Sequence, residues 1–369
     1  GHLEATFAKG FTENWTRFMD LHGELEYGFS DKQFRGFGRF RFKFNDISDA
    51  RLVVEGGRRT EQFNGIGPIS PLVNSLYSLF LRRNYMKLYE RVYGKVQYSQ
   101  RLMNGLFLEA SLVYAQRNPL VNHSDLSLYK KTGRSYYSNA PLDYNNPPLV
   151  DAPSFNPHQH LMFNVFMRIR FAQKFVSYPN RRFHIESKYP EIWLTYTKAI
   201  PLLGGDTDFD FLAVTVQKDQ LSIGTIGLMT LRGKYGVFLN RRKMEFIDYM
   251  HFTGNQTFIA KPDMHWRSYQ LLPYYQYSTG NWYVEGHFQH DFNGFLWSKL
   301  PLVKHLGFEV VAGYHFLYTA EQKDYMEFTI GLDRLGWKLL RFGRVDFVTA
   351  YKVGNKPKFG VVFALDFTL

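Results

Sequence analysis

Period-two alternation of apolar and polar residues runs through most of this chain and constrains its fold more than any other feature. Residues 39–44, RFRFKF, place Arg39, Arg41 and Lys43 on one face of an extended segment and three phenylalanines on the other. Successive side chains of a strand point to opposite faces, so such a segment has one polar and one apolar side. The same alternation recurs in residues 21–29, 105–117, 161–171 and 359–369.

These predicted strands are about ten residues long and are joined by short turn signals such as SDKQ, TAEQKD and GNKP. Strands of soluble sandwiches are mostly about five or six residues long. Strands of about ten residues with one lipid-facing and one lumenal side are typical of membrane barrels, in which closure removes unpaired edges. We predict an all-β fold over residues 1–369: a transmembrane antiparallel β-barrel of about 16 strands with short helical or irregular inserts.

The composition supports interleaved rather than segregated polarity. Aromatic residues make up 18% of the 369 residues, yet the mean hydropathy is −0.32. The absence of cysteine excludes disulfides, thiolate nucleophiles and cysteine-based zinc sites. The net charge of +12 comes from Lys and Arg residues spread singly along the strands, which predicts a basic lumen rather than a nucleic-acid partner.

Several segments break the alternation. In the insert at about 64–86, Ser70 is a predicted N-cap and Pro71 the first helical residue. The predicted interfacial helix carries an apolar stripe followed by two basic residues: Leu72, Leu76, Phe80, Arg82 and Arg83. Residues 118–158 contain six prolines and are expected to form a functional, partner-bound or partly disordered loop. Residues 240–267 form another insert.

The stretch from His287 to Glu309 begins with two histidines and an aspartate and continues as an apolar segment, so it could form either a metal site or a segment on the membrane surface. His287 and His290 are three residues apart, so a regular strand points them to opposite faces and they cannot share one metal ion. We therefore predict no metal site there. The insert at 293–307 has the composition of a segment that lies at headgroup level, through Phe295, Leu296, Trp297, Lys299, Pro301 and Lys304. An ordinary packed turn is the alternative.

No complete nucleophile-elbow, zinc-protease, phosphate-loop or dinucleotide motif is present, so we expect no catalytic residues and no cofactor. Asp206, Asp208 and Asp210 resemble the start of a calcium loop. However, Phe211 and Gln217 stand where such a loop requires glycine and glutamate.

Pairing of Phe29 with Phe34 across SDKQ would set the register of the first clear hairpin. That register places Glu24 opposite Arg39 and His22 opposite Arg41 on the polar face, which also carries Lys43. We predict a lumenal Glu24–Arg39 pair.

The orientation follows from counting strands back from the C-terminus. If the last strand enters the periplasm, GNKP, TAEQKD and STGN lie outside the cell. The insert at 293–307 lies on the periplasmic side, and the count places 240–267, 118–158 and 64–86 there with it. This arrangement would invert the usual pattern of short periplasmic turns and long outer loops.

Several stretches resemble a Gram-negative outer-membrane family called domain of unknown function 5686. They are SPLVNSLYSLFLRRNYMKLYER, SKYPEIWLTY, HFTGNQTFI and WYVEGHFQHDFNGFLWSKLPLVKHL, and the likeness runs from about residue 65 to the C-terminus. The resemblance implies the outer membrane and brings no established catalytic residues. In that family a carboxypeptidase-regulatory-like periplasmic domain usually precedes the barrel, and we expect that domain to be absent from this chain.

Taken together, these features predict a non-enzymatic integral outer-membrane barrel in envelope biogenesis, protein export or transport. A diffusion pore and a membrane-embedded hydrolase are the alternatives. The expected partners are outer-membrane lipid or lipopolysaccharide and other outer-membrane or periplasmic proteins.

Overall fold

The computed structural model describes residues 1–369 except 13–15, 123–125, 129–135, 137, 142–154, 179–180, 186, 261, 297–306, 338–339 and 366–369. The strands and the α-helix of the described residues are β1 (His2–Gly10), β2 (Phe18–Gly28), β3 (Gln33–Lys43), β4 (Arg51–Gln62), α1 (Pro71–Leu81), β5 (Leu88–Met103), β6 (Leu106–Pro119), β7 (His158–Arg170), β8 (Lys174–Tyr178), β9 (Arg181–Ile185), β10 (Glu191–Ile200), β11 (Asp208–Ser222), β12 (Leu228–Lys243), β13 (Ile259–Ala260), β14 (Trp282–Asp291), β15 (Glu309–Thr319), β16 (Lys323–Trp337), β17 (Leu340–Lys352) and β18 (Lys358–Leu365). Short 3-10 helices cover Gly224–Ile226, Phe246–Asp248 and Pro262–Arg267.

One sixteen-stranded sheet dominates the molecule, which confirms the predicted all-β class and strand number. Apart from β13, the strands of this sheet follow the chain order and each neighbouring pair is antiparallel. The two-residue strand β13 stands after β18 and pairs with it in parallel. The strands β8 and β9 form a separate hairpin. An antiparallel order of this kind needs only local connections between neighbours.

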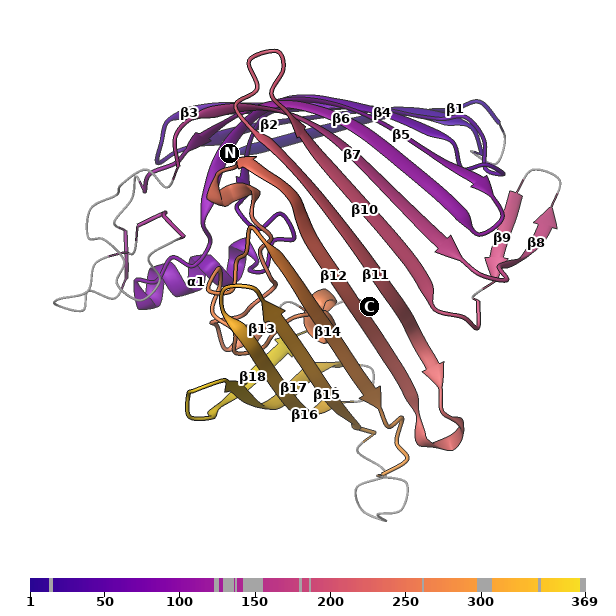
Figure 1. Cartoon of the computed structure of the whole chain (residues 1–369), viewed down its shortest axis with the longest axis vertical. Coiled ribbons are helices and arrows are strands. Elements are labelled where there is room, and N and C mark those ends of the chain that lie inside the picture. Colours follow the sequence, from indigo (N-terminus) through magenta and orange to yellow (C-terminus); the bar gives the residue numbers. More distant parts are fainter. Residues whose placement is uncertain are drawn as a thin grey trace.

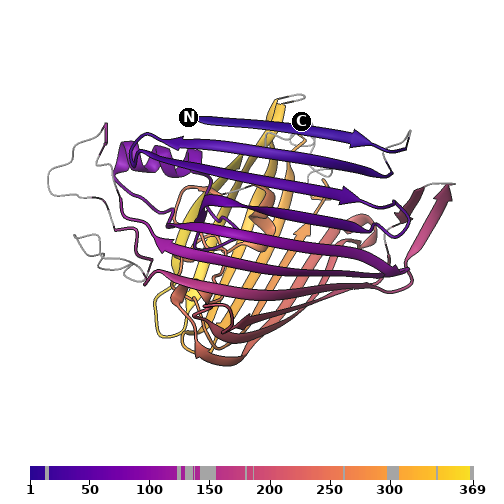
Figure 2. The same ribbon diagram turned by 90° about the horizontal axis from the view of Figure 1, so that it is seen from above.

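The sheet is strongly curved and encloses a lumen, with the first strands (indigo) on one side and the last strands (yellow) on the other (Figures 1 and 2). Because apolar and polar residues alternate along the strands, apolar side chains lie on one face of the sheet and polar side chains on the other. Large apolar side chains such as Leu25, Phe34 and Phe359 are exposed on the convex face. Acidic side chains such as Asp20 and Glu327 are buried on the lumenal face.

The two edges of the sheet are not joined to each other in the described residues. β1 pairs only with β2, and β18 pairs with β17 and, over two residues, with β13. The backbone N–H of Phe363 also donates to the carbonyl of Phe258, 2.7 Å away, so the segment around β13 covers part of the β18 edge.

The connections alternate between two ends of the sheet. The α1 end holds the described residues of the connections 29–32, 63–87, 120–157, 201–207, 244–281, 320–322 and 353–357. The opposite end holds the β8–β9 hairpin and the described residues of the connection 292–308.

The predicted placement of the inserts is therefore wrong. The described residues of 64–86, 118–158 and 240–267 lie at the α1 end, together with STGN, TAEQKD and GNKP. The described residues of 293–307 lie at the opposite end. The error has one source. Residues 268–277 do not cross the wall as a strand, so the connection from β12 to β14 leaves and re-enters the sheet at the same end.

Helix α1 begins and ends close to its predicted bounds. Ser70 caps it by accepting a hydrogen bond from the N–H of Val73 at 3.3 Å, and Pro71 is its first residue. Among the residues that the structure describes, no helix is long and apolar enough to cross a membrane.

Candidate functional site

The main feature of the lumen is the connection between β12 and β14, residues 244–281, here called the lumenal insert. Its buried residues Tyr269, Leu272 and Tyr277 pack with residues of the wall in one hydrophobic cluster. The wall contributes Tyr283, Leu317, Tyr325 and Ala350. Rings of this size bury a large apolar area, so the insert is held in the lumen by a packed aromatic core rather than by polar contacts alone.

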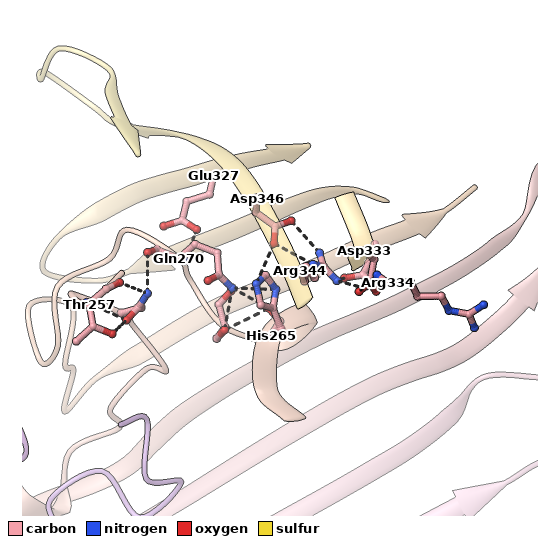
Figure 3. A network of polar contacts seen from close by, with 11 residues as sticks. Thr257, His265, Gln270, Glu327, Asp333, Arg334, Arg344 and Asp346 are labelled. Atoms are coloured by element: carbon pink, nitrogen blue, oxygen red, sulfur yellow. Dashed lines mark hydrogen bonds and ion pairs between the residues drawn. The ribbon is translucent and has the colours of Figure 1, made fainter. Parts of the chain in front are cut away.

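A buried carboxylate of β16 fastens the insert to the wall. Glu327 is fully buried, and its Oε2 accepts a hydrogen bond from the backbone N–H of Gln270 at 2.6 Å. Its Oε1 accepts from the N–H of Leu271 at 2.7 Å and from the hydroxyl of Tyr325 at 2.6 Å. Figure 3 shows Glu327 pointing at the insert from the sheet. Glu327 therefore accepts three short hydrogen bonds, two from the insert and one from a tyrosine of its own strand.

A second polar contact joins the 3-10 helix of the insert to β17. Nε2 of His265 lies 3.0 Å from Oδ2 of Asp346, at an angle that does not make a hydrogen bond. Arg344 binds both oxygens of Asp346, at 2.9 and 3.0 Å (Figure 3). Burial lowers the pKa of His265, although the Asp346 carboxylate acts against this, and Arg344 balances the charge of the carboxylate.

The other side of the insert reaches the N-terminal half of the wall. Asp248 forms a buried ion pair with Arg117 of β6. The amide of Asn64 donates to the carbonyl of Phe252 at 3.2 Å, and the hydroxyl of Tyr77 in α1 accepts from the N–H of Phe258 at 2.8 Å. The insert therefore spans the lumen and connects both halves of the sheet.

A cavity of about 830 Å³ remains at the α1 end, between α1 and the lumenal faces of β2–β5. Its lining includes amide and hydroxyl side chains of the helix and of the segment after it, among them Asn74, Ser78 and Asn84. At its base, Arg35 pairs with Asp31 and lies 3.5 Å from Glu90. The lining of this cavity is thus mixed polar and apolar, and the cavity lies on the N-terminal side of the lumen.

The predicted lumenal residues face the lumen, but the predicted register of β2 and β3 is wrong. Glu24 lies opposite Phe37, and His22 rather than Glu24 lies opposite Arg39. Glu24 instead contacts Arg59 of β4 at 3.1 Å and His22 at 2.9 Å. The predicted Glu24–Arg39 pair does not form because the hairpin turn covers residues 29–32, which shifts the pairing by two residues.

Two other predicted lumenal cations also have acidic partners. Arg41 binds Asp20 at 2.5 Å, and Lys43 pairs with Asp46 in the turn that follows its own strand. These pairs lie along the wall and not across the lumen.

The apolar stripe of α1 is largely uncovered. Leu72, Leu76 and Phe80 are 71%, 41% and 51% exposed, while the buried residues of the helix are Asn74 and Tyr77. The two basic residues after the helix turn inward to protein partners: Arg82 lies 5.5 Å from the ring of Tyr136, and Arg83 donates to the hydroxyl of Tyr85 at 2.8 Å. The helix therefore presents an apolar surface at the α1 end.

The predicted membrane-surface segment is only partly described. Phe295 and Leu296 lie in the turn after β14, and Leu296 is exposed. Trp297, Lys299, Pro301 and Lys304 lie outside the described residues, as do Phe367 and Leu369 of the last alternating segment.

The histidines of β14 point to opposite faces, as predicted. His287 is buried in the lumen with its Nδ1 2.9 Å from Nδ1 of His315, and His290 packs on the ring of Phe292. In the described part of the chain, the group that brings three possible metal ligands together is Glu4, His22 and Glu24. The strand β1 was not singled out in the sequence, and only its pairing with β2 reveals this group.

The sequence profile described as "Family of unknown function (DUF5686) C-terminal domain" matches residues 1–332. The match includes the first 64 residues, which the likeness seen in the sequence did not cover. None of the curated proteins matches the sequence. A crystal structure of BamA from Haemophilus ducreyi lacking POTRA domains 1-3 is similar, at a TM-score of 0.45 and 10% identity over 98% of this chain and 68% of that chain.

Proposed function

The chain belongs to the family of unknown function DUF5686, whose C-terminal domain it contains, and on this premise we propose that it is an integral outer-membrane β-barrel without enzymatic activity. Its role in this proposal is that of a component of envelope biogenesis, protein export or transport machinery.

The convex face of the sheet supports insertion into a membrane. Large apolar side chains are exposed there on both the first and the last strands, including Leu21 and Phe34 as well as Ile330 and Phe347. Water would disfavour so much apolar surface, whereas lipid accepts it. The charged residues of the same strands face the lumen, as in Glu24 and Arg59.

The observation that carries the proposed role is the lumenal insert. A diffusion pore needs a continuous aqueous path. The lumenal insert spans the lumen and is held there by a packed aromatic cluster. It is also held by Glu327 of the wall, which accepts hydrogen bonds from two backbone N–H groups of the insert. This favours a plugged scaffold that acts through its surfaces and its partners.

Conductance in planar bilayers tests this choice. We expect the purified chain to show no stable open state, and deletion of residues 250–277 to create one. Stable conductance of the intact chain, equal to that of the deletion variant, would contradict the plugged scaffold and favour the diffusion pore.

A membrane-embedded hydrolase would need a nucleophile beside a histidine–carboxylate pair. His265 and Asp346 supply such a pair, but the contact at the other ring nitrogen of His265 is the amide of Gln270, at 3.5 Å. This supports a structural role for the pair. Labelling of the folded protein by a fluorophosphonate probe, lost in a His265→Gln variant, would favour the hydrolase instead.

The topology also supports an orientation. If the last strand enters the periplasm, as is usual for such barrels, then the α1 end faces the outside of the cell and carries the long connections. Single cysteines introduced at Lys356 and at Thr225 test this in a chain that has no native cysteine. An impermeant maleimide should label the first and not the second on intact cells. Purification of the complex under native conditions followed by mass spectrometry would then identify the partners.

A further inference from the structure

A small cavity between the lumenal insert and the wall has an unusual charge. Its volume is about 160 Å³, room for about five water molecules. The wall lines it with Trp193, Arg232, Lys234 and Glu285, and the insert contributes Arg267 among others. We call it the cationic cavity.

The charges in this cavity do not balance. The Nζ of Lys234 lies 3.9 Å from Oε1 of Glu285, and these side chains are only 14% and 10% exposed. In the part of the chain that the structure describes, neither Arg232 nor Arg267 has a carboxylate within ion-pair distance. Three cations and one carboxylate therefore leave two positive charges around one small space.

The surroundings do not screen these charges well. The guanidinium of Arg232 lies 5.5 Å from the ring of Trp193, and its Nε is buried without a hydrogen-bond partner. His251, which also lines the cavity, is buried, and this lowers its pKa to about 3, so it adds no charge. Three cations close together, of which Lys234 is largely removed from water, repel one another, and a bound anion offsets that cost.

We infer that the cationic cavity binds one small doubly charged oxyanion of the phosphate class, held by Arg232, Lys234 and Arg267. Two guanidinium groups and one ammonium group suit such a ligand, because arginine binds its oxygens in pairs and lysine acts as a point charge. A phosphate group carries about 1.5 to 2 negative charges at pH 7, which matches the excess. Arg267 belongs to the insert and the other two cations to β12, so the anion also ties the insert to the wall.

Equilibrium binding of radiolabelled inorganic phosphate to the detergent-solubilised chain tests this inference. We expect saturable binding of one phosphate per chain, with competition by sulfate and not by chloride. Binding should weaken at least tenfold in Arg267→Gln and in Lys234→Met. The matched control is Lys95→Met, because Lys95 also faces the lumen beside a glutamate, Glu55 at 3.5 Å, and is not among the residues that line the cavity. This control should bind as the parent chain does.

Competition by glycerol 3-phosphate separates the two sources of a phosphate group. Equal competition by the ester means that a lipid headgroup can enter, and its failure restricts the cavity to the free ion; both results support the site. A gel shift between heated and unheated samples verifies that each variant is folded. Absence of saturable binding, or binding that persists in folded Arg267→Gln and Lys234→Met variants, would overturn the inference.

Discussion

Replacement of Glu327 by alanine should release the lumenal insert while leaving the wall intact. The change removes the acceptor of two backbone N–H groups, from Gln270 and Leu271, and of the Tyr325 hydroxyl. A buried donor left without a partner costs about 1 to 3 kcal/mol, so the loss of all three partners weakens docking of the insert by roughly 3 to 9 kcal/mol. At about 1.4 kcal/mol for each factor of ten, docking weakens roughly a hundred- to a million-fold.

Cysteine protection measures this release directly, because the chain has no native cysteine. Ala260 of the insert is buried against Val348 and Val362, so a cysteine introduced by Ala260→Cys should react slowly with a maleimide. We expect Glu327→Ala to raise the labelling rate by at least a hundredfold and to give transient conductance in bilayers. Glu55→Ala is the control, because Glu55 pairs with Lys95 along the wall and should leave the rate unchanged.

One result would refute the reasoning. If the Glu327→Ala variant remains folded by heat modifiability and the thiol introduced by Ala260→Cys stays as protected as before, then the three hydrogen bonds do not hold the insert. The aromatic cluster around Tyr269 alone would then be sufficient.

Three further experiments each test one local feature of the structure. A Cβ on Gly236 would clash with the buried ring of Tyr283, so Gly236→Ala should lower the thermal midpoint, as measured by heat modifiability on gels. Double-mutant cycles should give a coupling of up to about 1 kcal/mol between Glu24 and Arg59 and none between Glu24 and Arg39, and the reverse result would restore the sequence-based register. Burial lowers the pKa of His251 from about 6.5 to about 3, so the unfolded state binds the proton more tightly. The contribution of His251 to stability is complete above pH 6.5 and falls by about 1.4 kcal/mol per pH unit as the pH drops toward 3. Urea unfolding at pH 7 and pH 5 should show a smaller acid loss for His251→Gln, and an equal loss would contradict the assignment.

The faces of the strands could be predicted from the sequence, because alternation is a local property of an extended chain. Leu21 and Leu25 are exposed on the convex side and Glu24 faces the lumen, as the pattern indicates. The register could not be predicted with the same certainty. A shift of two residues keeps every side chain on its face, so the pattern fits both pairings equally well. The turn decides between them, and Lys32 adopts φ 54° there.

An insert was predicted at 240–267, but its continuation through residues 268–277 was missed for a different reason. Residues 268–277, SYQLLPYYQY, are apolar and aromatic enough to resemble a strand between two turns. Their partners are Glu327 and other residues of strands that follow much later in the chain, and no local pattern reports such contacts. The cationic cavity escaped notice likewise, because Arg232 and Arg267 are far apart in the sequence and meet only across the lumen.

The direction of the edge strands limits how the wall can close. An even number of antiparallel steps separates β1 from β18, so both run from the α1 end to the opposite end. Direct contact between them would form a parallel ladder, which is slightly weaker per residue than the antiparallel ladders of the rest of the sheet. One additional strand that pairs antiparallel with both β1 and β18 would instead satisfy the free N–H and C=O groups of each edge. The wall would then be a closed barrel with an even number of strands. In hydrocarbon each such group left unpaired costs several kcal/mol, so the parity of the strand count sets where this wall is weakest.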